Sequence, residues 1–273
     1  MNTYLAFILL SVLALIHQSP AQQAPTAPAP AAEPTPAPQA PAWVQNFNNL
    51  PETTRKEYIT KFQQAEKLFA QKRTMECLFL MPELEKLFTG NPGLYNLRGA
   101  CYIEIRNVKK ALENFKMAQK LDPNNSTIQF NIAEAHYVNH DYATALKEFT
   151  TLLDTYKKQQ QAGDIEPLLQ FKRYICARKL QNADLAKQLE TLHGPMDDTP
   201  YYYCVQAVML YLDNKKEAAQ EKMLACLRIH QATNAFQAFL DAMTEAGILP
   251  SPYGQTVPNQ PDKKTGLEKA PSA

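Results

Sequence analysis

Glycine is scarce in this chain of 273 residues, charge of neither sign dominates, and apolar runs are short. Only 8 glycines are present, which gives a glycine-rich phosphate-binding loop little material. The 28 Lys and Arg nearly balance the 27 Asp and Glu, so the composition gives no support to a nucleic-acid or polybasic membrane-binding role. The apolar stretch at residues 5–16 is shorter than the roughly 20 residues that a membrane-spanning helix needs.

Catalytic and metal-binding motifs are also lacking. Serine-hydrolase, phosphate-loop and dinucleotide-binding motifs are absent from the sequence. His136 and His140 share a helix face, but no third ligand has supporting spacing. We therefore predict a protein that is not an enzyme and that carries no metal or cofactor. No two cysteines have the C-x-x-C spacing of a zinc or redox site, and each lies on or beside an apolar helix face: Cys77, Cys101, Cys176, Cys204 and Cys226. The pattern favours buried apolar cysteines; a disulfide, with Cys77 and Cys101 the best-placed pair, is the alternative.

The N-terminal segment up to Ala21 is typical of a secretory signal peptide. The apolar stretch is followed by Ser19-Pro20-Ala21, which offers small residues for cleavage after Ala21. The segment Met1-Asn2-Thr3-Tyr4 contains no Lys or Arg, which departs from the usual pattern, and a buried helix of a domain is the alternative. We expect an exported protein, periplasmic or extracellular, with no integral membrane segment after cleavage.

Proline divides the rest of the chain. Of 20 prolines, 8 lie in residues 20–42, 5 in residues 250–273 and only 7 in residues 43–247. Residues 22–42 hold 7 prolines and 8 alanines, a composition that favours extended polyproline II and cannot build a core. We predict a disordered Pro/Ala-rich linker at 22–42, a folded domain at 43–247 and a disordered tail at 248–273.

A constant spacing recurs within the folded domain. A small residue is followed by apolar residues at steps of twelve, four and three, and the small residues themselves stand at 65, 99 and 133, with a period of 34. Two small residues twelve apart across a turn let two antiparallel helices approach closely, with the later residues on one face of the second helix. The three series are Gly99, Ala111, Phe115 and Ala118; Ala133, Ala145, Phe149 and Leu152; and Ala65, Cys77, Met81 and Leu84.

At these positions the chain resembles the tetratricopeptide repeat (TPR) family, whose signature is matched by Gly99, Tyr102, Ala111, Phe115, Ala118 and Pro123, while Tyr95 stands where tryptophan is common. The resemblance implies an all-α fold, a right-handed superhelix of about five helix pairs. The clearest repeats are 58–91, 92–125 and 126–159. After an insertion, degenerate repeats are expected at 164–195 and 200–231, and a last helix at 233–246 with Gly247 as its C-cap. Trp43 and Phe47 predict a short helix that covers the first repeat.

The resemblance also implies a binding surface. TPR proteins generally bind peptides or partner domains on a concave face lined by the first helix of each pair. Carried onto this chain, the family's groove positions are Asn96, Ile103, Glu104, Phe130, Glu134 and Tyr137. The alternative for Phe130 and Tyr137 is packing between helices. We therefore predict a non-catalytic scaffold of the cell envelope that binds a protein or peptide, with a structural subunit of an envelope assembly or a carbohydrate-binding protein as alternatives.

Overall fold

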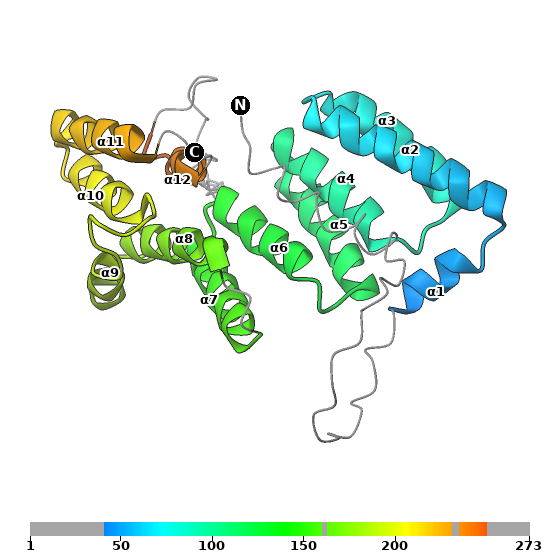
Figure 1. The fold of residues 1–273 in the computed structure, drawn as a ribbon, viewed down its shortest axis with the longest axis horizontal. Coiled ribbons are helices and arrows are strands. Elements are labelled where there is room, and N and C mark those ends of the chain that lie inside the picture. Colours follow the sequence, from blue (N-terminus) through cyan, green and yellow to red (C-terminus); the bar gives the residue numbers. More distant parts are fainter. Residues whose placement is uncertain (1–40, 160–162, 231–234, 250–273) are drawn as a thin grey trace, which may run out of the picture.

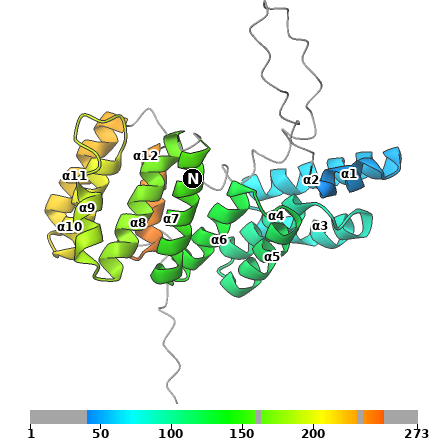
Figure 2. The same cartoon turned by 90° about the horizontal axis from the view of Figure 1, so that it is seen from below.

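The computed structural model describes residues 41–159, 163–230 and 235–249, and every regular element in these ranges is helical. The sequence-predicted signal peptide and nearly all of the linker and tail lie outside the described residues. Figures 1 and 2 show the helices stacked side by side along the chain. They are α1 (Ala42–Asn48), α2 (Glu52–Ala70), α3 (Thr74–Leu87), α4 (Pro92–Glu104), α5 (Val108–Leu121), α6 (Ser126–Val138), α7 (Tyr142–Lys158), the 3₁₀ turn η2 (Gly163–Ile165), α8 (Glu166–Lys179), α9 (Ala183–Glu190), α10 (Tyr201–Leu212), α11 (Lys216–His230) and α12 (Ala235–Glu245).

Ten of these helices form five adjacent pairs, which confirms the predicted fold class. The pairs are α2–α3, α4–α5, α6–α7, α8–α9 and α10–α11, and each second helix begins at the fourth position after the end of its first helix. In the first three pairs the second helices begin at 74, 108 and 142, so the period of 34 is present in the backbone. The last two second helices begin at 183 and 216, at intervals of 41 and then 33, which places the insertion between the third and fourth pairs.

One turn geometry joins the helices of every pair. The middle residue of each turn has a positive φ of 57–63°, although none of these residues is glycine: Lys72, Arg106, His140, Gln181 and Asn214. In the second pair, the amide of Asn107 donates to the carbonyl of Tyr102 at 2.8 Å and the amide of Arg106 to that of Ile103 at 2.9 Å. These bonds form a Schellman motif, which closes the first helix and reverses the chain. The Asn107 side chain then caps α5 by accepting from the amide of Lys110.

Close helix crossings lie where the small residues recur. Ala65 and Ala133 are fully buried, and a Cβ added at Gly99 would lie 2.4 Å from Cε1 of Phe115. Glycine therefore lets α4 approach α5 to a distance that alanine would not allow without movement of the ring. The first pair is covered by α1, as predicted. The ring of Phe47 lies 5.4 Å from those of both Tyr58 and Phe88.

The last helix, α12, belongs to no pair. It packs on α8, α10 and α11, and Figure 1 shows it beside α6 and α8, away from the free end of the stack. The ring of Phe239 lies 4.8 Å from that of Phe171 on α8. Gly247 follows the helix with a φ of 66°, which confirms it as the C-cap. The position of α12 matters for function because it covers one part of the surface that the sequence predicted for binding.

Candidate binding surface

The candidate surface is the one formed by the first helices of the pairs, α2, α4, α6, α8 and α10, which we call the first-helix face. Within it α2 contacts α4, α4 contacts α6, and α8 contacts α10. The six sequence-predicted residues lie on α4 and α6. The structure separates this face into an open part, on α2 and the C-terminal end of α4, and a part on α6 that α12 covers.

On α4, Asn96 is a buried polar residue, not an open contact. Its Oδ1 accepts a hydrogen bond of 2.8 Å from Nδ2 of Asn131 on α6. Both side chains are nearly inaccessible, and buried amides need such partners. The bond ties two neighbouring pairs together, so the side chain of Asn96 contributes to the stacking of the repeats.

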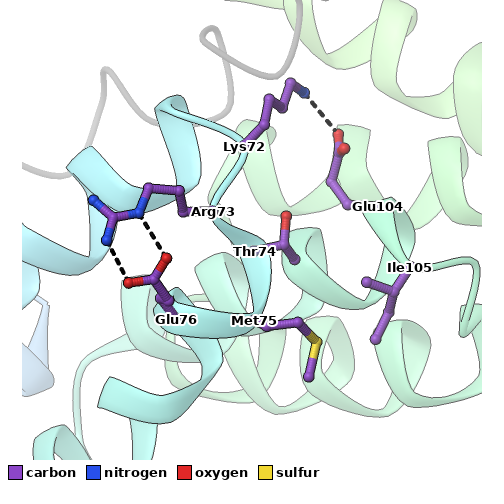
Figure 3. A pocket seen from close by; sticks show the side chains of 7 residues that line it. All are labelled: Lys72, Arg73, Thr74, Met75, Glu76, Glu104 and Ile105. Carbon is purple, nitrogen blue, oxygen red and sulfur yellow. Dashed lines mark hydrogen bonds and ion pairs between the residues drawn. The ribbon is translucent and has the colours of Figure 1, made fainter.

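Ile103 and Glu104 lie at the other end of α4. Ile103 is half-buried and packs on the cluster around Phe115. Glu104 lines an open pocket of about 390 Å³ at the edge of the first two pairs (Figure 3). Its Oε1 is 3.0 Å from Nζ of Lys72, so the turn of the first pair holds this carboxylate in place. The complete lining is Lys72, Arg73, Thr74, Met75, Glu76, Glu104 and Ile105.

Glu66 on α2 was not among the predicted site residues. With the period of 34 it stands in register with Ala100 on α4 and Glu134 on α6. Burial raises its pKa to about 7, and no charged neighbour among the described residues offsets that rise. The open part of the face therefore presents a poorly solvated carboxyl group.

On α6, Phe130 and Tyr137 pack inside the molecule. Phe130 is half-buried against Phe149, with ring centroids 6.2 Å apart. Tyr137 has no exposed surface, and its hydroxyl donates to the carbonyl of Ala242 on α12 at 2.7 Å. The packing alternative for Tyr137 is therefore the arrangement observed, and its contact with an outside partner would require α12 to move.

Glu134 belongs to a buried charge cluster. Nζ of Lys172 on α8 lies 2.7 Å from Oε1 of Glu134 and 3.2 Å from Oε2 of Glu245 on α12. The same ammonium lies 4.4 Å from the centre of the Tyr137 ring, within the range of a cation–π contact. The Lys172 side chain is only 4% exposed. Side chains from α6 and α12 thus surround the Lys172 ammonium of α8.

The protonation of this cluster follows from its burial. Burial raises the pKa of Glu134 to about 8, because the favourable effect of Lys172 is smaller and the carboxylate of Glu245 adds to the rise. Burial also opposes the charge of Lys172, but the two carboxyl groups outweigh it and raise its pKa. Burial and the neighbouring acid therefore favour the neutral form of Glu134, whereas the two acids favour the charged form of Lys172.

Sequence reasoning missed Lys172 and Glu245, and it predicted the last helix but not its place against α6 and α8. A signal was available for Lys172, since it follows Phe171 and precedes Tyr174 on a helix with many buried residues. A lysine at such a position calls for an acidic partner. The sequence offered no indication of which acid, because Glu134 and Glu245 are 38 and 73 residues away.

Metal sites and membrane spans are not found in the part of the chain that the structure describes. No group of three or more His, Cys, Asp or Glu side chains in ranges 41–159, 163–230 and 235–249 could hold a metal ion. His140 instead contacts the Glu245 carbonyl through Nε2 at 3.0 Å. Among the described helices, none combines the length and the apolar character needed to cross a membrane.

Comparison with known proteins gives a likeness at the level of structure only. No protein-family description and no curated protein matches the chain. Among solved structures, one described as a functional characterisation of Pseudomonas aeruginosa PilF is 10% identical, covers 70% of this chain and 99% of its own, and has a TM-score of 0.38. A structure of Naa15/Naa10 bound to HypK-THB is 18% identical with a TM-score of 0.37, and the match covers 76% of this chain and 30% of that one.

Both neighbours contain TPR motifs, but at these scores the likeness carries no argument about function. The assignment of a TPR-like helical repeat rests on this chain's own backbone, in which three pairs recur with a period of 34 and five pairs share one turn.

Proposed function

We propose that this protein is a non-catalytic scaffold that binds protein or peptide segments on its first-helix face. The most direct support for the proposal is a contact within the molecule. On α6, α8 and α10 this face already holds a helix, α12, through an aromatic contact, side-chain hydrogen bonds to its backbone and an ion pair. A surface with these features has the chemistry to bind a helical segment of another protein.

The open part of the face, on α2 and the C-terminal end of α4, is where an outside partner has direct access. Ala70 and Glu104 hold equivalent positions at the ends of these two helices, and Ala70 is exposed. Half-buried Glu66 lies one turn before Ala70, and burial raises the pKa of its carboxyl group to about 7. A basic side chain of a partner would supply the charge that favours its ionised form.

We further propose export to the cell envelope, in the periplasm or outside the cell. The support is the sequence alone, in the apolar stretch and the small residues that end at Ala21. N-terminal sequencing of the protein from its native host tests this proposal. Export with cleavage predicts a mature chain that begins at Gln22, whereas an intact Met1 in the mature protein would contradict it.

Site-specific photo-crosslinking tests the binding role. A photoreactive phenylalanine analogue at Ala70, on the first-helix face, is compared in the native host with the same analogue at Lys116, exposed on the second helix α5. The proposal predicts crosslinks to a discrete protein from Ala70 and not from Lys116. Equal labelling from both positions would favour a structural subunit that uses both faces. An absence of protein crosslinks from Ala70 would refute the binding role of this face.

A further inference from the structure

The covering helix contacts the first-helix face with one continuous apolar stripe. Phe239, Ala242, Met243 and Ala246 are each no more than 2% exposed, and their spacing of three, one and three places them on one side of a helix. Phe239 lies against Phe171 of α8. The stripe belongs to the same buried cluster as Tyr137, Tyr174 and Val205, so α12 is held by residues from α6, α8 and α10.

The C-terminal end of α12 receives hydrogen bonds from side chains of the third pair. The backbone amides of Ala246, Gly247 and Ile248 close this end of the helix by donating to the carbonyls of its last turn. Here the Tyr137 hydroxyl donates to the carbonyl of Ala242 at 2.7 Å, and Nε2 of His140 contacts that of Glu245 at 3.0 Å. The Tyr142 hydroxyl lies 3.4 Å from the carbonyl of Ala246. The side chains of the third pair thus recognise the end of a helix, whatever side chains it carries.

One side chain of α12 is recognised as well. Glu245, in the last turn, pairs with Lys172. The positive charge of this ammonium also interacts favourably with the negative, C-terminal end of the α12 helix dipole. An apolar stripe, a C-terminal turn whose carbonyls accept side-chain hydrogen bonds, and an acid in that turn therefore define what this part of the face accepts.

The covering helix differs from the helices of the repeat. Each of those is joined to its pair by the shared turn, whereas α12 follows the fifth pair and folds back along the chain to α6, where Tyr137 and Ala242 are 105 positions apart. A helix of 11 residues is marginal by itself. Its helical form therefore depends on the face that it covers, as for a ligand that folds on binding.

We propose, on the basis of the proposed function, that α12 is an internal competitor for the first-helix face. The partner of the part formed by α6, α8 and α10 is then an amphipathic helix with an aromatic residue, a small residue and Met spaced as in Phe239, Ala242 and Met243, and with an acid in a last turn that ends on glycine. The partner displaces α12 and takes over its contacts with Tyr137, His140 and Lys172.

Tethering sets the strength of the competition. A segment attached by a short linker acts at an effective concentration of the order of millimolar. A free peptide of the same sequence with a dissociation constant of about 1 µM would then bind the intact chain about 10³-fold more weakly than a chain whose own α12 is detached.

The test uses the full chain and a fluorescein-labelled synthetic peptide that spans residues 235–249. Met243→Glu places a charge in the buried stripe and is expected to detach α12. Thr244→Glu adds the same charge at a partly exposed neighbouring position and serves as the matched control. Fluorescence anisotropy should show at least tenfold tighter peptide binding by Met243→Glu than by the unaltered chain or by Thr244→Glu. A peptide with lysine in place of Glu245 should bind Met243→Glu at least tenfold more weakly, since it would face Lys172.

Hydrogen exchange of the unaltered chain provides the second measurement. A displaceable α12 predicts amide exchange in residues 238–246 at least tenfold faster than in α6 and α8, through opening of α12 alone. Exchange of α12 only together with α8 would overturn the proposal, as would collapse of α6–α11 in Met243→Glu. Failure of the peptide to bind a Met243→Glu chain that retains the exchange protection of α6 and α8 would also overturn it. None of these outcomes alters the photo-crosslinking result from Ala70, which tests the proposed function separately.

Discussion

Replacement of Gly99 by alanine tests the helix crossing on which the repeat depends. Gly99 is buried in α4 at the point where this helix meets α5. An added Cβ would lie 2.4, 2.6 and 3.0 Å from three carbons of the Phe115 ring. The ring is 1% exposed and packs among Tyr95, Ala118 and Ile128, so it cannot move away without disturbing a second layer of side chains.

Two opposing effects set the magnitude. Extra carbon in a packed core costs about 1–3 kcal/mol. Alanine in place of glycine inside a helix contributes about 1 kcal/mol in the other direction. We expect Gly99→Ala to lower the free energy of unfolding by about 1 kcal/mol, and Gly99→Leu, which adds three more carbons, to lower it further.

Urea denaturation followed by far-ultraviolet circular dichroism measures the effect. The control is a double-mutant cycle with Phe115→Leu, which removes ring atoms from the space that the new methyl group needs. In the double mutant, the cost of Gly99→Ala should fall by about 1 kcal/mol or more relative to its cost beside Phe115. An unchanged or raised denaturation midpoint for Gly99→Ala with Phe115 present would refute the argument that this contact limits the approach of α4 to α5.

Three further predictions concern the turns, the charge cluster and the cysteines. Arg106→Gly should raise the free energy of unfolding by about 1 kcal/mol and Arg106→Val should lower it, because the φ of 59° at this position suits glycine and strains a β-branched residue; urea midpoints of both variants decide this. The pKa of Glu134 is raised from 4.5 to about 8 in the folded chain, so the folded state binds more protons than the unfolded state between these values, and the contribution of Glu134 to stability should be lost as pH rises through about 8. Glu134→Gln should flatten that dependence in urea titrations from pH 5 to 9. The sulfurs of Cys77 and Cys101 lie 3.4 Å apart, so oxidised glutathione should join them by thiol–disulfide exchange with release of reduced glutathione; peptide mass spectrometry should find this link and find Cys176 still free, whereas alkylation of both cysteines after oxidation would contradict the expectation.

The repeat could be predicted from the order of amino acids without a structure. The period of 34 in small and apolar residues reports contacts between helices that are neighbours along the chain, and such contacts depend on local spacing. Ala65, Ala111 and Phe149 are therefore buried where the pattern placed them. The pattern also located Phe47 over the first pair and Gly247 at the end of the last helix. The sequence did not predict which turn residues have a positive φ. At arginine or histidine this backbone conformation is imposed by the helices on either side of the turn.

The place of α12, and with it the accessibility of the predicted binding residues, depends on tertiary packing. The contacts of α12 with α6 and its following turn join residues 105 positions apart. A repeat period predicts contacts that recur along the chain, and this contact occurs once. The period of 34 gave Asn96, Phe130 and Tyr137 a position relative to their own repeats. It could not show that Asn96 would bond to Asn131, or that Tyr137 and Glu134 would meet α12 and Lys172. Repeat geometry follows from neighbouring contacts, whereas the occupancy of the face follows from one long-range packing event in which an apolar helix buries its stripe on α6, α8 and α10.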